Sequence, residues 1–191
     1  PAAKTVLQKI VELYPDFTGP DSAYRMLAAA HRALGETNDE RQVLIRFAER
    51  DGEAPDAYLR LMELAADTQD WPAVVQNARR YLAVDPLVAP PYRFLAQASE
   101  KTGETKTAIA ADRALLQLDP PNPATVNFHL AQLLHQANDP AARLHVLKAL
   151  EDAPRCTRVA ELPLVKVRQS MEQVGQAILV GLGAVVGGAL E

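Results

Sequence analysis

Residues 55–88 read PDAYLRLMELAADTQDWPAVVQNARRYLAVDPLV, and the landmark residues of this stretch recur at one fixed interval on both sides of it. Tyr58 has counterparts at Tyr24 and Tyr92, each 34 residues away (58 − 24 = 34 and 92 − 58 = 34). The same interval separates a set of leucines and a set of aspartates: Leu27, Leu61 and Leu95, and Asp51, Asp85 and Asp119. A fixed period of this length indicates a chain built from repeated units that stack on one another.

Each repeat predicts two helices joined by a tight turn. In residues 55–88, apolar side chains such as Tyr58, Leu61 and Ala65 follow the three-and-four spacing of an amphipathic helix. A second apolar stripe begins after Asp70, which is the expected N-cap of the second helix. Pro72 suits the first turn of that helix, where a missing N–H has no cost. The unit is therefore a helix, a turn and a helix.

The period divides the chain into a half repeat, four whole repeats and a C-terminal segment. The predicted bounds are 1–15 for the half repeat, 21–54, 55–88, 89–122 and 123–157 for the whole repeats, and 158–191 for the C-terminal segment. The half repeat supplies only a second helix, so the sequence reads as a segment of a longer protein. We expect an all-α array over 1–157, followed by a capping helix and an apolar, glycine-rich tail.

Composition and charge exclude some classes of partner and chemistry. The 48% of apolar residues is enough to bury a core. The 20 Lys and Arg against 24 Asp and Glu give a net charge of −4, which lacks the basic excess of a nucleic-acid binder. Cys156 is the one cysteine, so no internal disulfide can form, and we expect a buried structural thiol.

The histidines do not have the spacing of a metal site. His31, His129, His135 and His145 include no pair three or four residues apart, the separation that lets two helical side chains share a metal. His31 falls on an apolar stripe and is expected to be a packed, hydrogen-bonded core residue. Asp112 lies where an apolar residue is expected. We therefore predict no metal, no cofactor and no catalytic residue.

Several features of the repeats carry a family resemblance. They are small-residue pairs, turn glycines and Asp-Pro endings: Leu27-Ala28 and Leu95-Ala96, Gly35 and Gly103, and Asp85-Pro86 and Asp119-Pro120. Together they resemble the tetratricopeptide repeat over roughly the first four-fifths of the chain. Three departures are tyrosine in place of the usual first-helix tryptophan, Gln69 in place of the turn glycine, and Glu40 in place of a small residue. The resemblance implies a right-handed superhelix of helix pairs.

The resemblance also implies a concave groove, lined by the first helices, that receives a peptide or a partner helix. The expected groove residues are Arg25, Arg32, Leu59, Glu63, Arg93, Gln97, Phe128 and Gln132. Their mixed charge argues against the clamp that some members of the family use to hold the C-terminal carboxylate of chaperone tails. Ala29, Pro90 and Phe94 stand where that clamp needs asparagine or basic residues.

Two functional hypotheses follow. The first is a non-catalytic protein–protein interaction scaffold that binds a peptide or a helix in the groove. The second rests on residues 128–155, FHLAQLLHQANDPAARLHVLKALEDAPR, which resemble repeats at the C-terminal end of bacterial proteins that begin with a peptidase-MA-like zinc hydrolase domain. That resemblance implies an accessory domain of a larger protein, either cytoplasmic or associated with the cell envelope. The His-Glu-x-x-His zinc motif is absent from the sequence, so no catalytic residue transfers.

The segment 174–190, VGQAILVGLGAVVGGAL, has no charged residue over 17 positions (190 − 174 + 1 = 17). Three interpretations stay open. It caps the last apolar face of the array, it mediates self-association, or it anchors the chain in a membrane. The third is the least favoured, because the segment is short for a bilayer and its five glycines weaken a helix.

Overall fold

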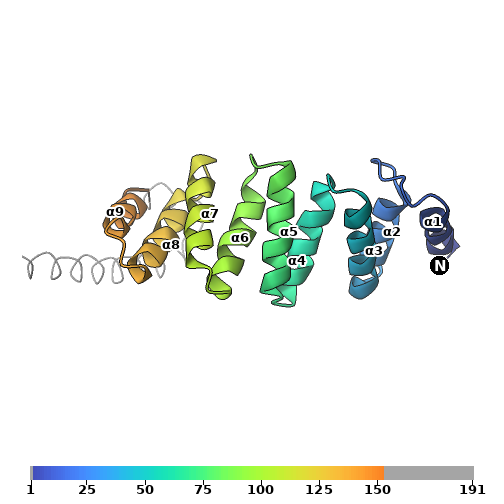
Figure 1. The fold of residues 1–191 in the computed structure, drawn as a ribbon, viewed down its shortest axis with the longest axis horizontal. Coiled ribbons are helices and arrows are strands. Elements are labelled where there is room, and N and C mark those ends of the chain that lie inside the picture. The colour runs from blue at the N-terminus through green and yellow to red at the C-terminus, as the bar shows by residue number, and fades with distance from the viewer. Residues whose placement is uncertain (1, 153–191) are drawn as a thin grey trace, which may run out of the picture. The chain divides into compact units, whose positions relative to one another are not determined.

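The computed structural model describes residues 2–152, and every regular element in that range is a helix (Figure 1). The helices are α1 (Ala2–Leu13), α2 (Ala23–Ala33), α3 (Thr37–Arg50), α4 (Pro55–Asp67), α5 (Trp71–Val84), α6 (Ala89–Lys101), α7 (Thr105–Gln117), α8 (Pro123–Gln136) and α9 (Ala142–Asp152). The predicted all-α fold class is confirmed. Within residues 2–152, no helix combines the length and the apolar character that crossing a bilayer requires.

Three predictions fall on residues that the structure does not describe. They are the capping helix within 158–191, the role of the segment 174–190, and the buried position of Cys156. They stay predictions.

The described residues form two compact units. Unit 1 (Pro1–Thr102) contains α1 to α6, and unit 2 (Gly103–Glu191) contains α7 to α9. Helices that follow one another in the sequence pack side by side within each unit, from α1 to α6 and from α7 to α9. In unit 1, α4 also contacts α6, so two consecutive first helices are neighbours. The boundary between the units lies inside the predicted repeat 89–122.

Apolar side chains of residues 21–54 form a large part of the core of unit 1. Tyr24, Leu27 and Phe47 are each at most 2% exposed. The rings of Tyr24 and Phe47 stack with their centroids 5.6 Å apart. His31 is 4% exposed and its Nδ1 lies 2.7 Å from a carboxylate oxygen of Glu36, which confirms the prediction of a packed, hydrogen-bonded histidine.

Some apolar side chains in α1 and at the end of α2 are exposed. Leu34 is 60% exposed, because α2 ends at Ala33 and Leu34 is its C-cap. In α1, Val11 is buried, whereas Val6 is more than half exposed, as is Tyr14 just after the helix. The helix that α1 packs against is α2, so only one side of α1 is covered in unit 1.

The tyrosines that mark the repeat have a second role besides packing. The hydroxyl of Tyr24 donates a hydrogen bond to the carbonyl of Pro15, at 3.1 Å. Tyr58 and Tyr92 bond in the same way to carbonyl oxygens six residues earlier, at 3.2 and 3.1 Å. Each tyrosine therefore fastens its first helix to the loop that enters the repeat, and it satisfies a backbone acceptor there.

The turn inside each repeat has a residue with left-handed backbone geometry. The φ angles are 71° at Gly35, 56° at Gln69 and 77° at Gly103, positions that follow the 34-residue period (35 + 34 = 69 and 69 + 34 = 103). Asn138 occupies the corresponding turn between α8 and α9, with φ of 55°. Glycine tolerates this geometry without cost, but glutamine has a Cβ that crowds the backbone.

We therefore expect Gln69→Gly to stabilise the protein. Removing the strain of a non-glycine residue at positive φ gains about 1 kcal/mol, less the extra entropy that glycine gives the unfolded chain. A gain of this size corresponds to a rise in Tm of about 2–4 °C for a chain of this length. Thermal unfolding followed by circular dichroism checks it. Gly103→Gln is the matched reverse change and should lower Tm; a fall in Tm for Gln69→Gly contradicts the expectation.

The start of α5 is capped as the sequence predicts. The side chain of Asp70 accepts a hydrogen bond from the backbone N–H of Ala73 at 3.3 Å, and Pro72 lies in the first turn. The carboxylate satisfies an N–H that has no partner inside the helix, and its charge suits the helix N-terminus.

Unit 2 combines an apolar core with two buried polar pairs. Leu130, Leu134 and Val146 are at most 1% exposed and form the core between α8 and α9. Asp112, the unexpected acidic residue of α7, is 3% exposed and lies 2.7 Å from Nδ1 of His129 in α8. A buried carboxylate needs such a partner. This hydrogen bond therefore explains why the fold can accept Asp112 on the apolar face of α7.

The second buried pair joins α8 to α9. Nδ1 of His145 lies 2.9 Å from Oδ1 of Asn127, which is 4% exposed. Burial, together with the nearby cations Lys148 and Arg113, lowers the pKa of His145 below its ordinary value. The imidazole is therefore neutral at pH 7 and suited to a hydrogen bond with an amide.

Candidate functional site

A pocket of about 350 Å³ lies between the first helices of two consecutive repeats in unit 1. We call it the α2–α4 pocket. It is lined by Arg25, Ala28, Ala29 and Arg32 of α2, Leu44 and Phe47 of α3, and Asp56, Leu59, Arg60 and Glu63 of α4. Four of the eight predicted groove residues, Arg25, Arg32, Leu59 and Glu63, are thus brought together around one cavity.

The other four predicted groove residues lie elsewhere. Arg93 and Gln97 are exposed on α6 and do not line this pocket. Phe128 and Gln132 are half-buried on α8 in unit 2. Phe128 packs against Ala124 and Ala149, so part of its ring covers the contact between α8 and α9.

Arg25 is held on one wall of the α2–α4 pocket by two contacts. Its Nη1 donates to a carboxylate oxygen of Asp56 in α4. Its guanidinium carbon lies 4.9 Å from the centre of the Phe47 ring, a cation–π geometry. Its Nε is buried and has no hydrogen-bond partner among the described residues. The pocket therefore presents an aromatic floor with a cation fixed above it.

A buried carboxylate organises the other side of the pocket. Glu40, the first-turn residue of α3 that is 1% exposed, accepts hydrogen bonds from two arginines. Arg60 donates through Nε at 2.7 Å and through Nη2 at 3.0 Å, and Arg32 donates through Nε at 2.7 Å. Arg60 also donates from Nη1 to Glu63 at 2.8 Å. Three helices, α2, α3 and α4, are joined by this network.

The charges of the network are set by these bonds. Burial raises the pKa of the Glu40 carboxyl, but the hydrogen bonds from Arg60 and Arg32 outweigh it, so the pKa of Glu40 lies below its ordinary value of 4.5. The same bond raises the pKa of the Arg60 guanidinium further above its already high value. Glu40 and Arg60 are therefore both ionised at pH 7.

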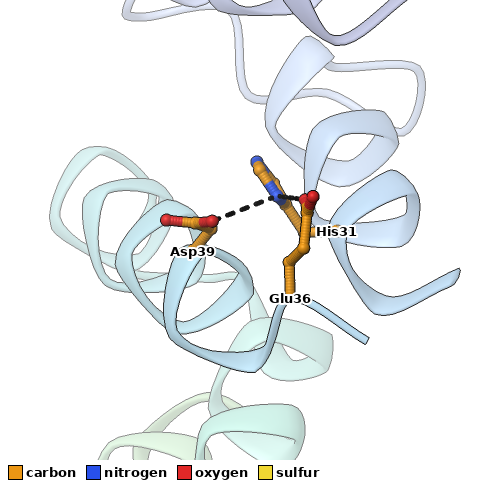
Figure 2. A group of neighbouring side chains, drawn as sticks. All are labelled: His31, Glu36 and Asp39. Atoms are coloured by element: carbon orange, nitrogen blue, oxygen red, sulfur yellow. Dashed lines mark hydrogen bonds and ion pairs between the residues drawn. The ribbon is translucent and has the colours of Figure 1, made fainter. Parts of the chain in front are cut away.

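Carboxylates also gather around His31, at the turn between α2 and α3 (Figure 2). Nδ1 of His31 lies 2.7 Å from Glu36 and 3.9 Å from Asp39. Both oxygens of Glu36 also accept from the ammonium of Lys4 in α1, at 2.8 and 2.5 Å. The hydrogen bonds from Lys4 and then His31 lower the pKa of Glu36. The group therefore joins α1, α2 and α3. The ammonium of Lys4 supplies the positive charge beside the Glu36 carboxylate.

A second pocket, of about 390 Å³, lies on the side of the second helices α3 and α5. Leu61 and Ala65 of α4 contribute to its lining, and charged residues such as Arg41 and Arg80 border it. None of the predicted groove residues lines it. It therefore provides an internal reference for experiments on the α2–α4 pocket.

Comparison with known proteins identifies the fold. No family model and no curated protein matches the chain. A crystal structure of MamA matches with a TM-score of 0.63 and 19% identity, covering 84% of this chain and 87% of that one. Residues 41 to the end of MamA from Desulfovibrio magneticus RS-1 match with a TM-score of 0.58 and 17% identity, covering 81% and 88%. YrrB, described as a TPR protein with an unusual peptide-binding site, matches with a TM-score of 0.64 and 12% identity, covering 87% and 81%. This chain has the tetratricopeptide repeat (TPR) fold.

The TPR fold explains which pocket residues the sequence could identify. The groove positions were predicted from first-helix spacing, which finds Arg25, Arg32, Leu59 and Glu63. The spacing does not indicate Arg60, which is half-buried beside Glu63. The departure of Glu40 from the small residue of the TPR pattern was the available signal, because a buried carboxylate requires cationic partners.

Proposed function

We propose that this TPR chain is a non-catalytic interaction scaffold that binds a peptide or a partner helix along its first helices. The observation that carries the proposal is the α2–α4 pocket, where an apolar floor is bordered by fixed charges of both signs. An apolar surface supplies affinity for a side chain, and charged groups at its rim select among partners. The peptide-binding site named for YrrB supports a peptide as the ligand class.

The test selects ligands without assuming their sequence. A phage-displayed library of random dodecamers is panned on the 191-residue chain, and the affinities of the selected peptides are measured by fluorescence polarisation. We expect selected peptides to bind the double variant Arg25→Glu, Arg93→Glu at least about tenfold more weakly, a loss of about 1.4 kcal/mol. The physical reason is that both reversals place a carboxylate where the first helices present a guanidinium.

The matched control makes the same change of charge on second helices. Arg46→Glu, Arg80→Glu replaces two exposed arginines on α3 and α5, one of which borders the second pocket. This variant should bind the selected peptides as the unmodified chain does. Circular dichroism spectra of both variants establish that they are folded. A library that yields no binders, or selected peptides that bind Arg25→Glu, Arg93→Glu unchanged, refutes the proposal.

Two further roles stay predictions. An accessory position in a larger hydrolase rests on the resemblance of residues 128–155 alone. Self-association through the segment 174–190 concerns residues outside the described range. Light scattering of the chain with and without that segment decides the second: a lower mass on deletion supports self-association.

A further inference from the structure

Glu40 is unusual among the residues at its position in the repeat. The period places Val74 and Ala108 at the corresponding positions of the next two repeats (40 + 34 = 74 and 74 + 34 = 108), and both are fully buried. A small apolar residue is therefore sufficient for the packing of the two helices. A carboxylate at this place must be removed from water, and buried ion pairs rarely repay that cost in stability. Glu40 is thus not explained by the fold alone.

The hydrogen bonds of Glu40 leave its two arginines in different states. Arg60 directs Nε and Nη2 to Glu40 and Nη1 to Glu63, so all of its nitrogens have carboxylate partners. Arg32 is held through Nε alone, and its side chain is 53% exposed. Among the described residues, Nη1 and Nη2 of Arg32 make no hydrogen bond. Arg60 therefore has no nitrogen left for a ligand, whereas the two terminal nitrogens of Arg32 remain available as donors at the edge of the pocket.

We propose that Glu40 is a positioning residue, which fixes the guanidinium of Arg32 beside the α2–α4 pocket to receive an aspartate or glutamate side chain of a bound peptide. The inference rests on the proposed function and names the chemistry of its ligand. The two terminal nitrogens of a guanidinium match the two oxygens of a carboxylate. Anchoring Nε in advance removes part of the conformational entropy that a free arginine side chain loses on binding.

The rest of the pocket favours a carboxylate side chain over a more highly charged anion. Asp56 and Glu63 also line it, and they would repel a dianionic phosphate more strongly than a monoanionic carboxylate. Leu44, Leu59 and Phe47 offer apolar surface to the methylene groups of an acidic side chain or to its neighbours in the peptide. The expected ligand is therefore an acidic peptide with apolar residues next to the acidic one.

The experiment extends the library selection to two variants, Glu40→Ala and Arg32→Gln. Dodecamers selected on the unmodified chain should be enriched in Asp or Glu, and this enrichment should be lost on both variants. The leading peptide is then synthesised with capped ends, so that side chains carry its only carboxylates. Replacing its Asp and Glu by Asn and Gln should weaken binding to the unmodified chain about tenfold. On either variant the same replacement should change the affinity less than about threefold.

The ratio of these two affinities separates positioning from a structural role. A change of the fold weakens both peptides together, whereas loss of positioning weakens only the acidic one. Arg32→Gln alters an exposed side chain and keeps the experiment decisive even where Glu40→Ala loses stability. An unchanged ratio in Glu40→Ala shows that Glu40 is structural and overturns the inference. Binders without acidic enrichment overturn it and leave the proposed function standing; the absence of any binder overturns both.

Discussion

Phe47→Ala is expected to lower the free energy of unfolding by about 3–5 kcal/mol. Phe47 is 1% exposed, stacks on Tyr24, and supports the guanidinium of Arg25. Removing the ring takes away its burial and its aromatic contact, and it leaves a cavity between α2 and α3 that close-packed neighbours cannot fill. Because the ring also forms the floor of the α2–α4 pocket, the same change should weaken every peptide selected on that pocket.

Urea unfolding followed by circular dichroism measures the effect of Phe47→Ala. Ile45→Ala is the matched control, since Ile45 lies on the same helix but is 38% exposed. The control should cost less than Phe47→Ala, because more than a third of Ile45 stays exposed to water in the folded chain. A loss below about 1.5 kcal/mol for Phe47→Ala would mean that α2 and α3 can close over the missing ring.

Arg60→Met should cost about 2–3 kcal/mol at pH 7. Methionine preserves most of the apolar stem, but Glu40 loses two of its three hydrogen bonds and keeps only the one from Arg32. A carboxylate that is 1% exposed cannot recover those bonds from water. The cost therefore comes from the charge that is left behind and not from the arginine itself.

The double variant Arg60→Met, Glu40→Ala tests this reason. With the carboxylate gone, no buried charge remains, and we expect the double variant to be more stable than Arg60→Met alone by about 1–2 kcal/mol. Urea unfolding of the two single variants and the double variant provides the thermodynamic cycle. Additive effects, within about 0.5 kcal/mol, would show that Arg60 acts independently of Glu40.

The contribution of Glu40 to the stability of the chain depends on pH, and the direction of that dependence can be stated. In the unmodified chain the pKa of Glu40 is lowered, so its contribution is complete above the unfolded-state pKa and is lost as the pH falls through the folded-state pKa. In Arg60→Met, only Arg32 remains to oppose the effect of burial, so the pKa of Glu40 should rise. Protonation at acidic pH should then remove the buried charge. The stability difference between the two proteins should therefore shrink between pH 7 and about pH 4.

The repeated elements could be predicted from the sequence because they depend on local rules. Apolar spacing fixed the helices, and the cap at Asp70 and the turns at Gly35 and Gly103 follow from short-range backbone geometry. The 34-residue period predicts the TPR fold, because the tyrosines, leucines and aspartates all recur at the same interval. Tyr58 illustrates the limit: its burial was predictable, but its hydrogen bond to the carbonyl of Gly52 was not visible in the pattern.

The chemistry of the pocket could be predicted only in part, because it depends on contacts between helices that lie apart in the sequence. Arg60 reaches Glu40 across 20 residues, and Arg25 reaches Asp56 across 31. First-helix spacing assigns a face to each residue, but it does not show which charges neutralise one another. Exposed Arg32 and paired Arg60 look equivalent in the sequence, and their difference comes from the bonds of one buried carboxylate.

The tyrosine hydrogen bonds also bear on how the array folds. They close loops of nine, six and six residues, from Tyr24, Tyr58 and Tyr92 to the carbonyl oxygens behind them. Closing so short a loop costs little chain entropy, so each of these bonds can form before its repeat meets a neighbour. An array with such local contacts has low contact order, the property associated with fast folding and with nucleation at more than one repeat.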